Sequence, residues 1–227
     1  MSRTLPVQWA LLSPLPAEVQ ARVLAVARRR RYDRGVVVFH EGETGDTLHL
    51  VESGRLAVRV STESGESVTL RILRCGDAFG ELALMRVHAV HHRTATVTAL
   101  EHSETLSLTG TTFDALRAKH PELDRLMVTL LAERVDQLSH RLLEALYVGV
   151  DRRVYRRLVE LADSYGDGTP GAILVPLTQD DLAGMAGATR PTVNQVLQRL
   201  AGDGVVSLGR RSITIEDLAG LRRRTGR

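Results

Sequence analysis

The 227-residue sequence predicts an α+β protein with a β-rich N-terminal module, a long central helix and a C-terminal helix-turn-helix that ends in a hairpin. Three observations predict this class. Glycine-punctuated alternating runs follow Val36, an apolar heptad pattern covers Glu122–Tyr147, and a capping box at Thr178 opens a pair of short helices. The predicted domain boundaries are 1–117, 118–150 and 151–227.

Composition excludes several classes of protein. Hydrophobic residues make up 43% of the chain, which is enough for packed cores. No run of eighteen apolar residues predicts a membrane span, and Met1–Leu15 lack the basic start and long apolar block of a secretory signal. The single Cys75 supplies neither a disulfide nor a set of thiolates for a metal or an iron–sulfur centre. We therefore expect a cytoplasmic protein with no membrane partner, no covalent cofactor and no metal site.

The charge is unevenly distributed along the chain. The net charge of +3 at pH 7 lies in residues 151–227, because residues 1–150 hold equal numbers of basic and acidic side chains. Lys119 is the only lysine, so nearly every cation is an arginine, whose planar guanidinium suits phosphates and guanine edges. A high-GC coding sequence explains this preference equally well, so the preference carries little weight.

The N-terminal module begins with a predicted helix and continues as short strands. Pro16–Ala27 has helical spacing, and the basic run Arg28–Arg31 is interpreted as the solvated end of that helix, with contact to nucleic acid as the alternative. Many short strands with glycine turns are typical of a small, jelly-roll-like barrel or sandwich. The predicted strands are Val36–Phe39, Leu48–Val51, Leu56–Val60, Val68–Leu73, Thr94–Ala99 and Thr105–Leu108.

One segment of this module interrupts the strand pattern. A helical turn that starts at Gly80 would point backbone N–H groups outward, as an anion site requires. Arg93 supplies a counter-charge, Thr94 a hydroxyl, and Glu81 an acceptor for a sugar hydroxyl; a surface pair of arginine and glutamate is the alternative. The intervening loop holds three histidines, His88, His91 and His92. We interpret these as exposed loop residues, with a metal or pH-sensitive site as the alternative.

Two apolar rows run along the predicted central helix. One alternates spacings of three and four, which is the pattern of two helices packed lengthwise, and we interpret it as a homodimer interface. The other is expected to cover the N-terminal module; a helix buried inside one domain is the alternative. The interface row is Val128, Leu131, Val135, Leu138, Leu142 and Ala145, and the covering row is Leu123, Leu126, Leu130 and Leu143. Gly149 follows the helix and is the predicted hinge.

The C-terminal part carries the most specific local pattern. Thr178 opens a capping box on a first helix, a Gly-Ala turn follows, and Thr189 caps a second helix with Pro191 in its first turn. A basic hairpin follows within Val205–Ile215. These elements predict a winged helix-turn-helix that binds double-stranded DNA; a three-helix packing unit without nucleic acid is the alternative.

The polar face of the second helix supplies the predicted DNA contacts. Arg190 is expected to bind guanine O6 and N7, Pro191 makes no hydrogen bond to a base, and Gln195 favours adenine. Phosphate contacts are expected to fix the register on the duplex. The full set of predicted DNA-binding residues is Thr178, Gln179, Thr189, Arg190, Pro191, Thr192, Gln195, Arg199 and Arg210. A dimer would place two such helices on half-sites of a near-palindromic operator roughly 34–36 Å apart.

The strand order, the glycine spacing and the Phe-Gly-Glu-Leu and Arg-Thr-Ala segments resemble the cyclic-nucleotide-binding domain of the CRP/FNR superfamily of bacterial transcription regulators. Thr-Arg-Pro-Thr-Val-Asn-Gln-Val-Leu resembles the recognition helix of the same family, so the resemblance covers nearly the whole chain. It implies a dimeric DNA-binding regulator controlled by a small effector, with cyclic AMP as the candidate and RNA polymerase as a further partner. The ligand-binding residues that it implies are Gly80, Glu81, Leu82, Arg93, Thr94, Arg134, Leu138 and Ser139, with Arg134 paired to Glu81.

Departures from the family pattern bear on the effector and the operator. Leu138-Ser139 stands where the cyclic AMP receptor has a Thr-Ser pair that contacts adenine, and the loss of such a contact costs about 1–3 kcal/mol. A cyclic nucleotide is therefore expected to bind weakly or with a changed base preference. Pro191 and Gln195 replace a glutamate and an arginine that read bases, so the half-site is expected to keep one guanine and otherwise to differ.

Two other functions compete with this interpretation. One is an effector-independent DNA-binding regulator whose N-terminal module serves only dimerisation or partner docking. The other is an enzyme such as a cyclic-nucleotide hydrolase, but the sequence has no metal-ligand cluster, no nucleophile with a paired base and no phosphate-cleaving motif. No catalytic residue is predicted.

Overall fold

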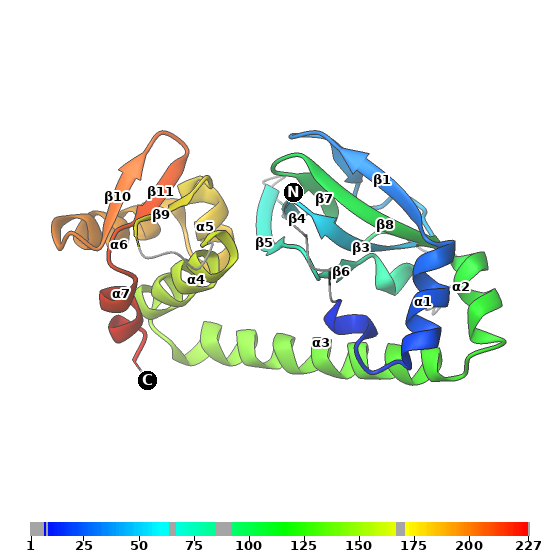
Figure 1. Cartoon of the computed structure of the whole chain (residues 1–227). Coiled ribbons are helices and arrows are strands. Elements are labelled where there is room, and N and C mark those ends of the chain that lie inside the picture. The colour runs from blue at the N-terminus through cyan, green and yellow to red at the C-terminus, as the bar shows by residue number, and fades with distance from the viewer. Residues whose placement is uncertain (1–6, 8, 64–66, 85–91, 167–170, 227) are drawn as a thin grey trace. The chain divides into compact units, whose positions relative to one another are not determined.

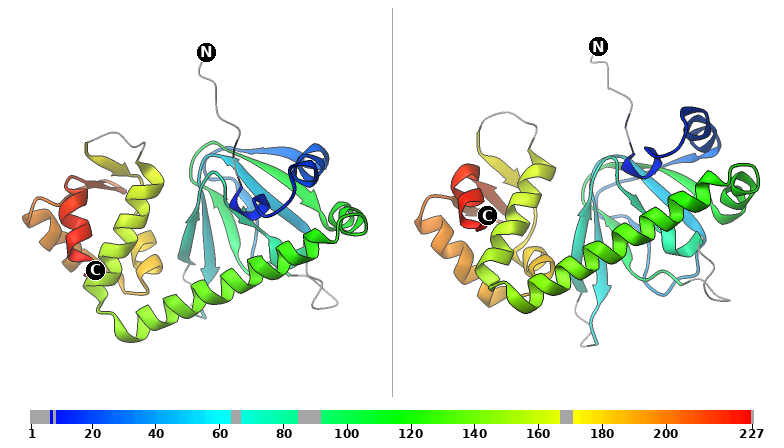
Figure 2. Two further views of the ribbon diagram at one scale, coloured as in Figure 1. Left: turned by 60° about the horizontal axis from the view of Figure 1, so that its bottom comes forward. Right: turned by 90° about the horizontal axis from the view of Figure 1, so that it is seen from below.

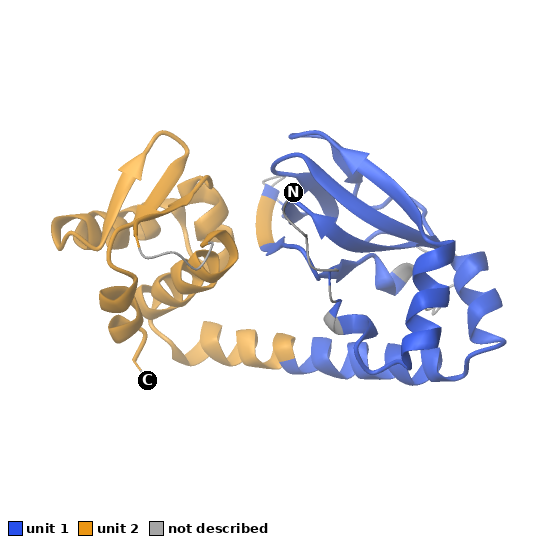
Figure 3. Ribbon diagram, viewed as in Figure 1, with its two compact units in different colours: residues 1–67, 71–136 blue, residues 68–70, 137–227 orange. Residues whose placement is uncertain are grey.

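The computed structural model describes residue 7 and residues 9–63, 67–84, 92–166 and 171–226 (Figure 1). Contacts divide the chain into two compact units, one of residues 1–67 and 71–136 and the other of residues 68–70 and 137–227 (Figure 3). The long helix α3, Glu122–Tyr147, begins in the first unit and ends in the second. The three-part division with boundaries at 117 and 150 stays a prediction. Among the described residues, no helix is long and apolar enough to cross a lipid bilayer.

The first unit is built around two four-stranded sheets, which Figure 2 shows from two sides. One sheet has the strand order β1-β8-β3-β6 and the other has the order β2-β7-β4-β5. The strands are β1 Arg28–Tyr32, β2 Val37–Phe39, β3 Thr47–Ser53, β4 Leu56–Ser61, β5 Ser67–Leu73, β6 Ala78–Phe79, β7 Thr96–Ala99 and β8 Ser103–Thr109. Each of the six predicted strands is present, with its ends shifted by two residues or fewer in every case.

The basic run after the first helix is a strand, so its interpretation as a helix end was wrong. Helix α1 covers Ala17–Val26, and β1 pairs with β8 in antiparallel register, which places Arg28 opposite Ser107 and Arg30 opposite Thr105. β1 lies at the edge of its sheet and only Tyr32 is partly buried. Charged side chains are common on such edges because they oppose pairing with another sheet. A run of four arginines has no apolar period, so only the tertiary pairing identifies it as a strand.

Two apolar clusters hold the first unit together. The cluster between the sheets takes residues from both of them, namely Val51, Leu56, Leu73, Phe79 and Val97. The other cluster packs the second face of β3 and β8 against helices, among them α2 (Gly110–Arg117), which was not predicted. Because side chains alternate along a strand, Leu48 and Leu50 face the helices, whereas Val51 faces the other sheet.

Helix α3 has a buried row near its start and exposed apolar residues further along. Leu123 and Leu126 are buried against the helix-facing cluster, and Leu130 packs against it, as predicted. Leu143, which was assigned to the same row, is 52% exposed, so that assignment was wrong. Leu143 lies roughly 20 Å along the helix axis from Leu130 and belongs to the second unit, beyond the reach of the cluster.

The second unit is a helix-turn-helix with a small sheet. Its elements are α4 Val150–Tyr165, β9 Ile173–Val175, α5 Gln179–Ala186, α6 Arg190–Gly202, β10 Val206–Gly209, β11 Ser212–Ile215 and α7 Leu218–Arg224. The predicted hairpin is present as β10 and β11, and β9 adds a third strand to it in the order β10-β11-β9. The final helix α7 was not predicted. The predicted winged helix-turn-helix architecture is thus confirmed.

Candidate ligand site and DNA-reading surface

The segment predicted to bind an anion forms a short turn directly after β6. The 3-10 helix η2 covers Glu81–Leu84, and Gly80 precedes it with φ of 80°, a conformation that strains other residues. A Cβ atom at Gly80 would also lie 2.8 Å from Nη1 of Arg93. Gly80 therefore turns the chain and leaves room for the guanidinium. The side chain of Leu82 is 46% exposed, so its predicted contribution is limited to the backbone.

Arg93 is the buried cation of the site, with 6% of its surface exposed. Its Nη1 donates to the carbonyl of Thr47 at 2.9 Å and to that of Gly80 at 3.4 Å, and Nη2 donates to Thr47 Oγ1 at 2.6 Å. The guanidinium lies 4.0 Å from the ring centroid of Phe39, which adds a cation–π contact. Nε has no hydrogen-bond partner among the described residues. Within the described part of the chain, Arg93 thus keeps one buried donor unpaired.

Glycine and acidic groups shape the surroundings of this guanidinium. A Cβ atom at Gly45 would lie 2.6 Å from Arg93 Nε, so Gly45 forms the second wall of the cradle. Burial lowers the pKa of Arg93, and the negative charges of Asp46, Glu43 and Glu81 act in the opposite direction. Because an arginine side chain does not lose its proton in proteins, the site keeps a full positive charge.

Glu81 and Arg134 form the ion pair that the family resemblance implied. Glu81 is 5% exposed, and its Oε1 accepts from Arg134 Nη2 at 3.2 Å and from Nε at 3.4 Å. Thr94 follows Arg93 and is exposed. Leu138 and Ser139 lie in the part of α3 that belongs to the second unit, and Leu138 is 62% exposed. Their role in ligand binding stays a prediction.

His49 is a further polar residue of this region, which sequence reasoning missed. It is 5% exposed, stacks on Phe79 at 4.9 Å between ring centroids, and has its ring nitrogens 3.2 Å from the hydroxyls of Thr47 and Thr105. Burial, reinforced by the positive charges of Arg93 and Arg30, lowers the pKa of His49 to about 3. The sequence signal that could have identified His49 is its position: a polar residue at an inward position of a strand otherwise rich in leucine and valine.

The histidine-rich loop gives no metal site in the described part of the chain. No group of three or more histidine, cysteine, aspartate or glutamate side chains is placed there to hold a metal ion. His92 Nδ1 donates to the carbonyl of Gly42 at 2.8 Å. His88 and His91 lie outside the described residues.

The first helix of the helix-turn-helix, α5, starts as predicted. The backbone N–H of Asp181 donates to Thr178 Oγ1 at 3.1 Å, and the N–H of Thr178 donates to Asp181 Oδ2 at 3.0 Å, which completes a capping box. The cap of α6 differs from the prediction, because Thr189 Oγ1 bonds to Thr192 Oγ1 at 2.9 Å and makes no cap bond to the backbone. Pro191 removes one N–H from the first turn, so a cap bond from Thr189 to that position is impossible.

Helix α6 separates an apolar face from a polar one. Val193, Val196, Leu197 and Leu200 are buried, as predicted. Arg190, Pro191, Gln195 and Arg199 are exposed, and Thr192 is half-buried. Two of these arginines form ion pairs that were not predicted: Arg190 with Asp180 at 3.4 Å and Arg199 with Asp151 at 2.8 Å.

The tip of the β10–β11 hairpin faces the start of α5 across a cavity of about 320 Å³. The lining includes Thr178, Gln179 and Arg190, which were predicted, and Arg211, which was not. Arg211 has φ of 58°, the only positive value among the described residues other than glycine. Arg210, the predicted wing residue, is exposed but does not line the cavity. The start of α5, the guanidiniums of Arg190 and Arg211 and the carboxylate of Asp180 thus surround this space.

The predicted hinge, Gly149, is the N-cap of α4 and lies two residues after the end of α3. Its φ of −57° is open to any residue, and nothing lies within 4 Å of a Cβ atom built there. The local geometry therefore does not require glycine, and the hinge stays a prediction.

Comparison with known proteins agrees with both halves of this description. Residues 29–120 match the cyclic nucleotide-binding domain, and residues 152–224 match the Crp-like helix-turn-helix domain. The chain is 33% identical over 198 residues to the CRP-like cAMP-activated global transcriptional regulator of Mycobacterium tuberculosis, covering 85% of this chain and 86% of that protein. It is 31% identical over 205 residues to the cyclic AMP receptor protein of Thermus thermophilus, covering 90% of each.

Solved structures show the same likeness. A CRP/FNR-family transcriptional regulator from Thermus thermophilus has a TM-score of 0.73 and 25% identity, covering 88% of this chain and 99% of that one. The Thermus thermophilus catabolite activator protein has a TM-score of 0.55 and 30% identity, covering 95% and 97%. Two domain matches in the right order and a similarity that spans most of both chains place this protein in the CRP/FNR superfamily, as a DNA-binding transcription regulator with a cyclic nucleotide-binding domain.

Proposed function

We propose that this regulator is a homodimer whose DNA binding responds to a cyclic nucleotide, with cyclic AMP as the first candidate. The observation that carries the proposal is the buried Arg93, which keeps an unpaired Nε inside a cradle of Gly45 and Gly80. A buried donor without a partner costs about 1–3 kcal/mol, and an anionic ligand that accepts from it recovers that cost. The cyclic phosphate would bind there, and Glu81, oriented by Arg134, would accept a ribose hydroxyl.

The base-recognition half of the site is proposed to be altered. Leu138 cannot hydrogen-bond to a purine edge, so the affinity would be low or the preference between adenine and guanine changed. Two relatives are named as a cAMP-activated regulator and a cyclic AMP receptor, which supports cyclic AMP over other effectors. Because Leu138 would change the preference between adenine and guanine, cyclic GMP is tested together with cyclic AMP.

The proposed partners follow from the helix-turn-helix unit, whose helix α6 is the proposed recognition helix. The target is a near-palindromic operator on double-stranded DNA, in which each half-site keeps one guanine that Arg190 contacts. RNA polymerase is proposed as a further partner. The proposed compartment is the cytoplasm, where the protein would meet both the operator DNA and RNA polymerase. The protein acts by binding rather than by catalysis.

Titration calorimetry with cyclic AMP and cyclic GMP tests the effector. The wild-type protein should bind at least one of them, and Arg93→Gln should weaken that binding about tenfold or more, because a charge-assisted contact to the phosphate is lost. Arg34→Gln, on the exposed turn after β1, is the matched control and should bind as the wild type does. Fluorescence of Trp9, the only tryptophan, reports whether each variant is folded.

Absence of heat with both nucleotides, together with retained operator binding, would contradict the effector proposal. It would favour the alternative, in which the N-terminal unit serves only dimerisation or partner docking. Hydrolysis of cyclic AMP by the purified protein would instead support the enzyme alternative.

A further inference from the structure

The cavity beside Arg93 has a second positively charged wall. Its volume is about 200 Å³, and its lining includes Arg28 and Arg30 from β1 as well as Arg93 and His49. No acidic side chain of the described chain lines it. Three guanidiniums around one small space repel one another, so the space favours an occupant with negative charge.

Arg28 and Arg30 differ from the other arginines of the same strand. Residues two apart on a strand point to the same side, so Arg28 and Arg30 share one side of β1 and Arg29 and Arg31 the other. Arg29 pairs with Glu52 and Arg31 pairs with Glu104. Within the described part of the chain, the side chains of Arg28 and Arg30 have no ion pair and no hydrogen bond. The cavity side of the strand therefore holds its cations unneutralised.

A helix start contributes to the same space. Thr109, the N-cap of α2, and Thr112 in its first turn both line the cavity, and this first turn contains no acidic residue. Helix N-termini favour anions because their first N–H groups are unpaired within the helix and the helix dipole is positive there. Asp46 lies near this end, 3.4 Å from a Cβ atom built at Gly110, but it does not line the cavity.

The size of the cavity restricts the occupant. About 200 Å³ corresponds to roughly six or seven water molecules, and pockets for whole organic ligands begin at about 300 Å³. A phosphate group fits this space and carries up to two charges. Phosphate also suits guanidinium groups better than a monovalent anion does, because two of its oxygens can accept from the paired N–H donors of one guanidinium.

We infer that this cavity binds a phosphate group at a second site, held by Arg28, Arg30 and the start of α2. The lining contains none of Gly80, Glu81, Thr94 and Arg134, so only Arg93 is shared with the proposed cyclic nucleotide site. The occupant is either free phosphate or the phosphate of a small ester whose remainder projects from the open side of the cavity. Its binding does not depend on the proposed effector.

The test uses the full-length protein in chloride buffer at constant ionic strength. Inorganic phosphate and glycerol 3-phosphate are titrated separately and followed by NMR of the His49 ring, with acetate as the monovalent control. Saturable binding of either phosphate, with movement of the His49 resonance, supports the site. Binding of inorganic phosphate alone identifies the free ion as the source, and binding of both extends the site to esters. No saturable change with either phosphate overturns the inference.

Variants separate a built site from general electrostatic attraction. Arg28→Gln combined with Arg30→Gln should weaken phosphate binding about tenfold or more, since two charge-assisted contacts are lost. Arg31→Gln, on the other side of the same strand, removes the same kind of charge and should leave binding nearly unchanged. Equal loss in Arg31→Gln would show that only net charge matters and would overturn the site. All three positions are exposed, so folding should be retained.

Glu81→Gln separates this inference from the proposed function. It should weaken cyclic nucleotide binding through the ribose contact and leave phosphate binding intact. A protein that binds cyclic AMP but neither phosphate contradicts the inference alone. A protein that binds phosphate but no cyclic nucleotide contradicts the proposed effector alone.

Discussion

At the scale of single residues, His49 links the stability of the first unit to pH. Burial opposes the charged form of its ring, and the charges of Arg93 and Arg30 act in the same direction, so the pKa falls from 6.5 to about 3. The unfolded chain takes up this proton near pH 6.5, whereas the folded chain takes it up only near pH 3. Acid therefore favours the unfolded state, and the stability due to neutral His49 is lost as the pH falls from about 6.5 towards 3.

We predict that His49→Gln flattens this pH dependence. Glutamine retains the capacity to hydrogen-bond to Thr47 and Thr105 but does not titrate. Between pH 7 and pH 5, the wild type should lose about 2 kcal/mol more unfolding free energy than the variant. Urea unfolding followed by fluorescence of Trp9, which is buried in the same unit, measures the difference. Parallel pH profiles for the two proteins would show that another group controls the acid sensitivity.

Arg190 is the residue on which the proposed operator specificity depends. In the free protein it pairs with Asp180 at 3.4 Å, but both side chains are more than half exposed. Exposed pairs contribute about 0–1 kcal/mol, so DNA can recruit the guanidinium at little cost.

Arg190→Ala should weaken operator binding by about 1–3 kcal/mol and relax selection at one guanine of each half-site. Selection of bound sequences from a random DNA pool measures both effects. Arg210→Ala is the comparison, because a wing contact to phosphate should lower affinity on all sequences alike. A uniform loss for Arg190→Ala as well would show that Arg190 contacts only the backbone.

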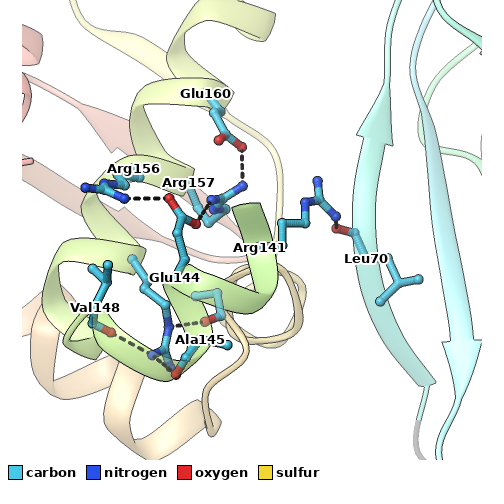
Figure 4. Close-up of polar contacts among 10 residues, drawn as sticks. Leu70, Arg141, Glu144, Ala145, Val148, Arg156, Arg157 and Glu160 are labelled. Atoms are coloured by element: carbon cyan, nitrogen blue, oxygen red, sulfur yellow. Dashed lines mark hydrogen bonds and ion pairs between the residues drawn. The ribbon is translucent and has the colours of Figure 1, made fainter. Parts of the chain in front are cut away.

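At the scale of elements, one carboxylate joins the end of α3 to α4. Glu144 accepts from Arg156 at 2.6 Å and also from Arg157, and Arg157 donates to Glu160 at 2.8 Å (Figure 4). Burial acts to raise the pKa of Glu144, but the hydrogen bond from Arg156 and the charge of Arg157 outweigh it, so the pKa is lowered. Glu160 shows the opposite balance: burial raises its pKa, and Arg157 only partly offsets this effect.

A third arginine, Arg153, stabilises the same junction. Arg153 donates to the carbonyls of Ala145 and Val148 at the end of α3, and to those of Ala186 and Gly187 at the end of α5. Carbonyls in the last turn of a helix have no partner within the helix, so one guanidinium satisfies two helix ends at once. Motion at Gly149 would therefore have to break side-chain contacts as well as rotate the backbone.

We predict that Glu144→Ala loosens this junction. The side chain of Arg157 is only 8% exposed and would lose its most buried partner, at a cost of about 1–3 kcal/mol. Amide hydrogen exchange at the end of α3 and the start of α4 should become faster. Glu160→Ala is the matched control, because Glu160 contacts the same arginine but is 52% exposed, and its loss should change exchange much less. Equal exchange in the wild type and Glu144→Ala would show that the ion pair does not restrain the junction.

Local sequence patterns were sufficient for elements whose signals lie within a few residues. The capping box at Thr178, the proline in α6 and the helical spacing of apolar residues in α3 each depend on neighbours along the chain. The strand β1 was misread because Arg28–Arg31 has no period and is defined only by its partner β8. The burial of Arg93, the ring stack of His49 and the ion pairs of Glu144 depend on residues distant in sequence, which spacing cannot reveal. Between Arg210 and Arg211, the backbone turn alone decides which one lines the cavity.

At the scale of the whole molecule, the exposed face of α3 bears on the oligomeric state. Val128, Val135 and Leu142 are spaced by seven residues and are each at least 60% exposed, as is Leu138 between them. Leu131 is half-buried and Ala145 is exposed. A continuous apolar row of this kind usually marks an interface, and heptad spacing suits a second copy of the same helix. Two copies would then present two α6 helices to a near-palindromic operator.

Leu142→Glu tests this arrangement, and Leu143→Glu is its matched control. Both leucines are exposed, at 60% and 52%, and they are adjacent on the helix, but only Leu142 belongs to the heptad row. In a dimer, Leu142→Glu would bury two carboxylates at one seam, so the measured mass should fall from twice the chain mass of 24.9 kDa to that of a single chain.

For Leu142→Glu, the affinity for the operator should fall together with the measured mass. A single chain binds only one half-site at a time, whereas a dimer binds both half-sites at once. Leu143→Glu should keep both the mass and the affinity of the wild type. Sedimentation equilibrium with and without operator DNA measures the mass, and a gel-shift titration measures the affinity. If the wild type sediments as a single chain even with operator present, α3 does not join two subunits. The proposal that one dimer binds two half-sites is then wrong.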